Sequence, residues 1–198
     1  MAYRSGKLWS TRYGSGCDRI GPTKAAQASS SSTDGSFPDP RRSETVPARV
    51  GAVFFDRRRL LPAQFSEVVT NDVLNTWIPR TTQIFKVELV AIVLALETFR
   101  HYMQDATVLL LVDAEAVEGV LVKGYSARSD VSLLVGQFWQ HAQALNAAIY
   151  IDRVPTDANC SDGPSRDKVY ICKQLGWLVL QARWASDVHK GGRAWGSV

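Results

Sequence analysis

The sequence predicts a single α/β fold built on a sheet of mixed strand direction, and three observations indicate it. Residues 49–55 and 62–70 are β-rich stretches separated by a short polar segment, which is typical of an antiparallel hairpin. Residues 81–103 carry apolar side chains at helical spacing. Residues 107–112 form a continuous apolar run, as in strands that are buried on both faces. A hairpin followed by a helix and a buried strand predicts helices packed on a mixed sheet.

The rest of the chain divides into a leader, the domain and an extension. Residues 1–32 are rich in Ser, Gly, Arg and Lys and predict a disordered basic leader. We expect the domain to span residues 33–170 and a C-terminal extension to span residues 171–198. The other expected elements are a helical turn at 71–77, helices at 114–122 and 130–146, a strand at 148–154, a loop at 155–166, and a last helix or strand at 177–184.

Composition is that of an ordinary globular protein. The chain has 198 residues, of which 45% are hydrophobic and 21% are charged, enough for one domain with its own core. The net charge of +4 belongs to residues 1–30, where five basic side chains accompany one acidic side chain. The remaining 168 residues carry 18 basic and 18 acidic side chains, so net charge does not identify a partner of the folded part.

Several classes of protein are excluded or disfavoured. The longest strongly apolar stretch, residues 87–96, is interrupted by Glu88 and is too short to span a membrane. We expect no secretory signal, because the N-terminal residues contain no hydrophobic segment. The three cysteines are odd in number and lack metal-ligand spacing, which argues against a disulfide scaffold or a zinc module. They indicate a reducing compartment inside the cell, either nucleus or cytoplasm.

Four acidic residues stand where an ordinary core would not place them. Glu88 lies on the side of the predicted helix that faces the sheet, where a buried carboxylate needs an arginine or a bound cation. Asp113 directly follows the apolar strand, where ligand sites of α/β sheets gather, although an Asp there also fits a helix N-cap. Asp162 fits an N-cap as well. Asp34 precedes a glycine, which is typical of a turn.

The order of these acids and the motifs around them resemble the ribonuclease H type 1 domain, particularly the form attached to retroelement reverse transcriptases. Residues 33–36 (TDGS) are similar to the first-strand motif of that family, and residues 84–96 (IFKVELVAIVLAL) to its glutamate helix. Residues 109–124 (LLLVDAEAVEGVLVKG) resemble its strand, aspartate and helix, and residues 154–166 (VPTDANCSDGPSR) resemble the ending of retrotransposon forms. The resemblance implies a ribonuclease H-like mixed sheet of five strands with flanking helices.

The first acid of the set has alternatives. The first strand of the family is usually apolar, whereas residues 27–33 read QASSSST, a composition that is unfavourable for a core strand. A longer insert also separates Asp34 from the next strand. Asp39 is therefore the alternative to Asp34, and Asp56 competes from the far end of that next strand.

The resemblance implies a two-metal phosphodiesterase that cuts the RNA strand of RNA–DNA hybrids. Carboxylates suit Mg²⁺, with Mn²⁺ as a possible substitute, and two such ions would lie about 4 Å apart. The family pattern implies that Asp34 and Asp113 bridge both ions, with Glu88 on one and Asp162 on the other. The expected partners are the hybrid itself and a reverse transcriptase domain.

Basic side chains in two segments are the candidates for binding the phosphate backbone. They are Arg57, Arg58 and Arg59 at the tip of the hairpin, and Lys123 and Arg128 after the short helix. Each also fits an ordinary solvated turn, so these assignments depend on where the fold places them.

Two other functions compete with the nuclease. Integrases and transposases share the same fold, but their essential Glu comes last, and here no Glu follows Glu118, which disfavours that class. The alternative function is a catalytically inactive ribonuclease H-like module that binds nucleic acid or acts as a scaffold in a polyprotein. The serine-rich segment in the place of the first strand favours this alternative.

Overall fold

A six-stranded sheet forms the centre of the computed structural model, which describes residues 29–38, 47–56 and 59–184. The strands are β1 (Ser29–Ser36), β2 (Arg49–Phe55), β3 (Ala63–Val68), β4 (Thr107–Val112), β5 (Ala148–Arg153) and β6 (Leu178–Val179). The helices are α2 (Asn71–Leu74), α3 (Ile84–Thr98), α4 (Arg100–Met103), α5 (Glu115–Lys123), α6 (Ser129–Ala144), α7 (Asp162–Ser165) and α8 (Val169–Gln174), with a 3-10 turn η2 (Thr156–Ala158). Among the described residues, none of these helices has the length and apolar composition needed to cross a bilayer.

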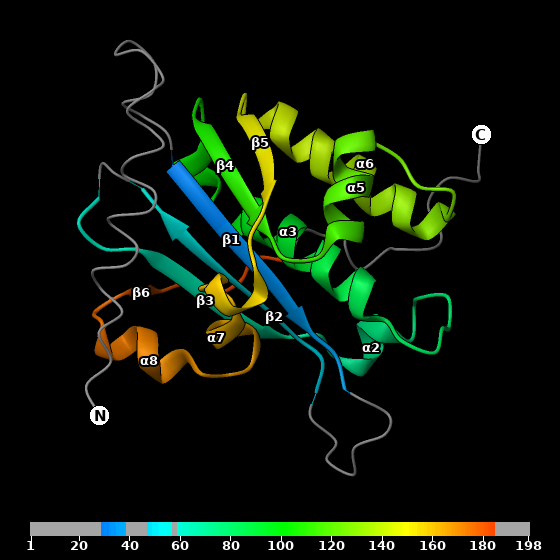
Figure 1. Ribbon diagram of the computed structural model, residues 1–198, viewed down its shortest axis with the longest axis horizontal. Helices are drawn as coiled ribbons and strands as arrows, with labels where there is room; N and C mark the ends of the chain where they lie inside the picture. The colour runs from blue at the N-terminus through cyan, green and yellow to red at the C-terminus, as the bar shows by residue number, and fades with distance from the viewer. Residues whose placement is uncertain (1–28, 39–46, 57–58, 185–198) are drawn as a thin grey trace.

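The sheet is mixed, as the sequence predicts. The strand order is β5-β4-β1-β2-β3-β6, so β1 lies between β4 and β2 (Figure 1). The pairs β1–β2 and β2–β3 are antiparallel, which confirms the expected hairpin. The pairs β1–β4, β4–β5 and β3–β6 are parallel. The expected five strands become six, because the extension supplies β6, in which Leu178 and Val179 pair with Ala63 and Gln64 of β3.

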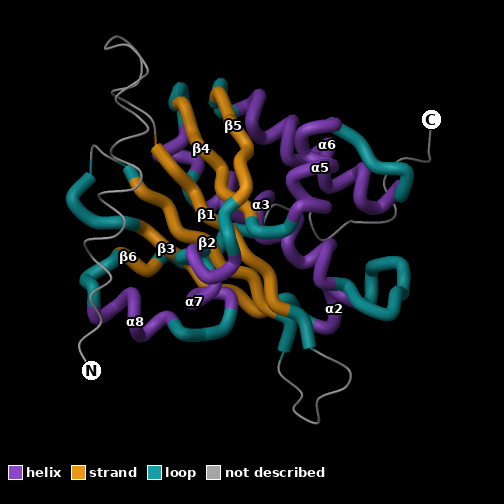
Figure 2. Tube along the Cα trace, in the orientation of Figure 1, coloured by secondary structure: helices purple, strands orange, loops and turns teal. Residues whose placement is uncertain are grey.

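Helices cover both faces of β1. Gly35 approaches the backbone of α3, whereas the side chain of its neighbour Asp34 bonds Ser165 of α7. Because consecutive side chains of a strand point to opposite faces, α3 and α7 lie on opposite sides of the sheet. In Figure 2, α5 lies beside β5, whereas α7 lies near β3.

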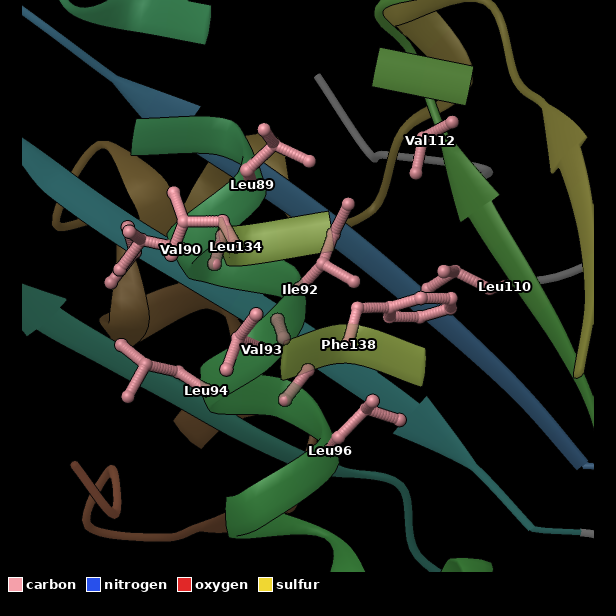
Figure 3. Close-up of a cluster of buried hydrophobic side chains, with 14 of the residues drawn as sticks. Leu89, Val90, Ile92, Val93, Leu94, Leu96, Leu110, Val112, Leu134 and Phe138 are labelled. Carbon is pink, nitrogen blue, oxygen red and sulfur yellow. The ribbon is translucent and has the colours of Figure 1, made fainter. Parts of the chain in front are cut away.

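Helix α3 is the core helix of the molecule. It is buried on most of its circumference rather than along one stripe, because it packs between the sheet and α6. Figure 3 shows this packing, with Ile92 and Val93 of α3 near Leu134 and Phe138 of α6. The single helix expected over residues 81–103 is divided at Phe99 into α3 and α4.

The first strand corrects the expected boundary of the leader. Residues 29–32, placed in the leader by their composition, form the first half of the central strand β1. Their burial comes from neighbours, because β1 lies between the apolar strands β2 and β4. Ser32 also finds hydrogen-bond partners, whereas the buried hydroxyls of Ser29 and Ser31 have none among the described residues. Composition alone therefore misplaced a strand whose side chains are small and polar.

Candidate active site

Asp34 lies near the carboxyl end of β1 and is only 6% exposed. Asp34 and Gly35 pair with β2 inside the sheet, as the resemblance to a first-strand motif implies, and they do not form the turn that an Asp-Gly pair alone indicates. The glycine is needed for close packing: a Cβ at Gly35 would lie 2.8 Å from the backbone nitrogen of Glu88. Asp34 therefore places one carboxylate in β1, and Gly35 lets α3, the helix that carries Glu88, approach that strand closely.

Glu88 and Asp113 reach the same region from α3 and from the end of β4. Strands β1 and β4 are parallel with Ser32 beside Leu111, so Asp34 and Asp113, two residues further on, come side by side. Glu88 and Asp113 both line one small hollow. The N-cap role considered for Asp113 is not found, because the capping position of α5 is Ala114 and no side chain caps it.

Asp162 is the first residue of α7, and its carboxylate is held by an arginine. Arg166 Nε donates to Asp162 Oδ1 at 2.5 Å. The N-cap of α7 is Ser161 rather than Asp162, so the alternative capping role of Asp162 is not found. The carboxylate is thus paired with a cation from its own segment.

Asn159 connects the loop before α7 to the central strand. Its Oδ1 accepts hydrogen bonds from Ser32 Oγ at 2.5 Å and from Ser161 Oγ at 2.6 Å. Its Nδ2 donates to the carbonyl oxygen of Thr33 at 3.3 Å. All three side chains are buried, so this loop is fixed to β1 immediately before Asp34.

Electrostatic interactions show that the four acids share one region. Burial, together with the charges of Asp113 and Asp34, raises the pKa of Glu88 to about 8, and burial is the largest of these causes. Burial also raises the pKa of Asp34 to about 6, with contributions from Asp113 and Asp162, against the lowering effect of the Ser165 hydrogen bond and of Arg166. Asp34 therefore interacts with each of the other three carboxylates, which come from three other parts of the chain.

Comparisons with known proteins place this arrangement in a known fold. The sequence matches no protein-family model and no curated protein. Among solved structures, RNase H1 from the halophilic archaeon Halobacterium salinarum NRC-1 is 20% identical, with a TM-score of 0.51 over 71% of this chain and 98% of its own. The N-terminal RNase H domain of a Mycobacterium tuberculosis protein is 18% identical, with a TM-score of 0.51 over 76% and 99% of the two chains. The chain has the ribonuclease H fold.

A further neighbour was solved with nucleic acid. LC11-RNase H1, in complex with an RNA/DNA hybrid, is 18% identical, with a TM-score of 0.50 over 72% of this chain and 99% of its own. The ribonuclease H-like α/β class predicted from the motifs is thus confirmed at the level of the fold.

The four acids offer the oxygen donors that Mg²⁺ prefers. Within the described part of the chain, however, no group of three or more His, Cys, Asp or Glu side chains is arranged to hold an ion. Burial and neighbouring carboxylates raise the pKa of both Asp34 and Glu88, and only for Asp34 does a cation, Arg166, act in the opposite direction. In donor chemistry and in charge the residues therefore fit a divalent cation, with Asp34, Glu88, Asp113 and Asp162 as the candidate ligands.

The alternatives for the first acid lie elsewhere in this ribonuclease H fold or outside its described part. Asp39 falls outside the described residues. Asp56 directly follows β2, and the last residue of that strand pairs with Ser30. Asp56 is therefore at the end of the sheet opposite Asp34, whereas Asp34 is the alternative that meets the other acids.

The basic candidates lie in two separate segments of the chain, and part of one segment is outside the described residues. Arg57 and Arg58 lie outside the described residues. The guanidinium of Arg59 lies 4.1 Å from the centroid of the Tyr102 ring, beyond the end of the sheet that is remote from Asp34. Lys123 and Arg128 are exposed on either side of the turn at Gly124, whose φ of 76° is left-handed.

A buried ion cluster that includes Lys86, two residues before Glu88, was not identified from the sequence. Asp130 of α6 accepts from Arg80 Nη1 and Nη2 at 2.8 Å and from Lys86 Nζ at 3.1 Å. Lys86 is 2% exposed, and its ammonium also lies 4.6 Å from the Trp77 ring. The available signal was a lysine inside the apolar helix, two residues before Glu88, because a buried lysine requires a partner.

Proposed function

We propose that this chain is a divalent-metal-dependent endonuclease that hydrolyses the RNA strand of RNA–DNA hybrids. The observation that carries the proposal is that β4, α3 and α7, the elements beside or on which Asp113, Glu88 and Asp162 lie, all meet β1 around Asp34. The ribonuclease H fold supports it, and so does the neighbour whose structure contains an RNA/DNA hybrid.

Each acid has a distinct place in the proposed mechanism. Asp34 and Asp113, at the ends of adjacent parallel strands, would be shared between two ions, with Glu88 on one and Asp162 on the other. Two bound Mg²⁺ ions would supply an activated water and stabilise the leaving 3′ oxygen. Burial of Asp34 and Glu88 strengthens their attraction for a cation, because the field of a carboxylate is screened less away from bulk water.

Substrate binding is proposed for the exposed basic residues nearest the short helix that follows Asp113. Lys123 and Arg128 would contact phosphates, and recognition of 2′-hydroxyls would distinguish RNA from DNA. Arg57, Arg58 and Arg59 remain candidates for a longer duplex, since the described part of that tip is remote from the acids.

A retroelement origin is proposed from the motif at residues 154–166, whose Asn159, Asp162, Ser165 and Arg166 match the ending of retrotransposon forms. A reverse transcriptase domain would then be the partner, and a reducing compartment, nucleus or cytoplasm, the location.

The test is cleavage of an end-labelled RNA–DNA hybrid, with single-stranded RNA, double-stranded RNA and double-stranded DNA as controls. We expect hybrid-specific cleavage that requires Mg²⁺ or Mn²⁺ and stops on addition of a chelator. Asp113→Asn keeps the size of the side chain and should lower kcat by about 100-fold or more, as loss of a transition-state contact does. If wild type and Asp113→Asn give the same cleavage pattern, with no products specific to the hybrid, the proposed enzymatic activity is refuted.

The alternative is an inactive module that binds nucleic acid or serves as a scaffold in a polyprotein. The pairing of Asp162 with Arg166 favours it, since an arginine satisfies this carboxylate without metal. Such a module would bind the hybrid equally well with and without Mg²⁺ and would leave it intact.

A further inference from the structure

Asp162 lies in the sequence between two residues that form hydrogen bonds to the central strand β1. Asn159 lies three residues before it and Ser165 three residues after it. Both are buried, and both reach β1 across more than 120 positions of sequence. The position of Asp162 relative to Asp34 is therefore set by two anchors.

The two anchors differ in what they bond. Asn159 bonds the hydroxyl of Ser32 and the backbone carbonyl of Thr33, so it fixes the loop to the strand. Ser165 Oγ donates to Oδ2 of the Asp34 carboxylate itself. The same hydroxyl lies 3.1 Å from the carbonyl oxygen of Asp162, so it touches the segments that carry both acids.

Close packing of α7 on the sheet keeps Ser165 in contact with Asp34. A Cβ at Gly51, the β2 residue paired with Asp34, would lie 2.4 Å from the backbone nitrogen of Ser165. Ser36 Oγ also donates to the carbonyl oxygen of Ser165 at 2.7 Å. The backbone of Ser165 is thus docked independently of its side chain, which leaves the hydroxyl to bond the carboxylate.

We infer that Ser165 is a positioning residue for the proposed nuclease: its hydroxyl fixes the orientation of the Asp34 carboxylate, which would hold a metal ion. The inference rests on the proposed function. A hydrogen bond to one carboxylate oxygen restricts rotation about the Cβ–Cγ bond and so directs the other oxygen. Partners that orient metal ligands in this way typically change metal affinity or activity by about 10- to 100-fold when they are removed.

The chain offers a matched control. Ser36 bonds the same residue of α7 from the same strand, but it bonds the backbone and not the carboxylate. Ser36→Ala therefore removes one contact between β1 and α7 and leaves the bond to Asp34 in place. Ser165→Ala removes the bond to Asp34 and leaves a small space, whereas Ser165→Cys fills that space with a much weaker donor.

The experiment measures Mn²⁺ binding by calorimetry on the full chain, together with kcat and KM on the hybrid. We expect Ser165→Ala and Ser165→Cys each to weaken Mn²⁺ binding by about tenfold and to lower kcat, with KM for the hybrid unchanged. Ser36→Ala should bind Mn²⁺ as wild type does, and thermal unfolding should show that all three variants fold.

Each other outcome counts against the inference. If Ser165→Ala binds Mn²⁺ like wild type, the hydroxyl does not orient the ligand. If Ser165→Cys restores binding or Ser36→Ala weakens it equally, packing of α7 is responsible instead. A wild-type chain that neither binds Mn²⁺ nor cleaves the hybrid would refute the proposed function itself, which is a different result.

Discussion

Glu88 is a carboxylate whose charge the folded chain disfavours. Burial, Asp113 and Asp34 together raise its pKa from 4.5 to about 8. An unfolded chain releases this proton near pH 4.5, so the folded state binds more protons between these two values. Stability must then fall as pH rises through this window, with no penalty below it and the full penalty above it. Asp34, with a pKa raised from 3.8 to about 6, adds an effect of the same sign.

Replacing this carboxylate should therefore stabilise the protein in the absence of metal. In a chelator, Glu88→Gln should unfold at a higher temperature than wild type, by a margin that grows from about pH 5 to about pH 8. Thermal unfolding over this range measures the margin. Addition of Mg²⁺ should stabilise wild type more than the variant, which lacks one of the candidate ligands. A margin that does not change with pH would contradict the raised pKa.

At the scale of elements, α3 and α6 are joined by charge as well as by apolar packing. Lys86 of α3 is buried, and burial lowers its pKa, while hydrogen bonds from Arg80 and Lys86 hold the pKa of Asp130 well below its usual range. The cluster fixes the first turns of both helices, and Glu88 lies within one turn of Lys86. It thereby supports the part of α3 that carries a candidate ligand.

Breaking this cluster should cost more than removing it. Asp130→Asn leaves the Lys86 ammonium buried without a counter-charge, which typically costs about 3–5 kcal/mol in the free energy of unfolding. The double variant Lys86→Met, Asp130→Leu leaves no buried charge and should lose much less. Urea unfolding of both variants measures the difference. An equal loss in the two would show that packing volume, not charge, holds the helices together.

Elements with apolar patterns could be predicted from the sequence, and polar or short ones could not. The apolar run at residues 107–112 coincides with β4, and the hairpin is present as expected. Composition assigns the first half of β1 to the leader. The serines of this strand are buried by neighbouring strands, which their own polarity does not indicate. Helix α7 has four residues, too few for any periodicity to show.

Residues of the candidate site could be predicted from the sequence only where their position in a strand or helix is unusual for a charged side chain. Asp113 after a buried strand and Glu88 inside an apolar helix could be selected by that criterion. The contacts of Ser165 with Asp34 and of Asn159 with Ser32 could not, because they join residues 131 and 127 positions apart. Hydrogen bonds over such separations depend on the tertiary structure, which spacing does not reveal.

At the scale of the whole molecule, the net positive charge is concentrated in the first residues of the chain. Residues 1–28 contain five basic side chains and one acidic side chain, and β1 begins directly after them. The remaining residues are neutral overall, although they contain the four acids of the candidate site. Non-specific attraction for a polyanion should therefore come largely from the first 28 residues, and chemistry from the fold.

Deletion of residues 1–28 tests this separation. We expect the shortened chain to keep its kcat and to bind the hybrid more weakly at low salt. Each neutralised phosphate contributes about 0.9 to the slope of log K against log salt, so loss of five cations should flatten the slope by up to about 4.5. Fluorescence anisotropy between about 50 and about 200 mM salt, in an Asp113→Asn background that prevents cleavage, measures the slope.

A full-length control separates charge from chain length in that experiment. Its five basic residues, Arg4, Lys7, Arg12, Arg19 and Lys24, are replaced by glutamine. Because counterion release depends on charge, the control should show the same flattened slope as the deletion. An unchanged slope in both would place the contacts with phosphate on the folded domain, where Lys123 and Arg128 are the candidates. A loss of kcat in the deletion but not in the control would instead show that these residues support the fold of β1.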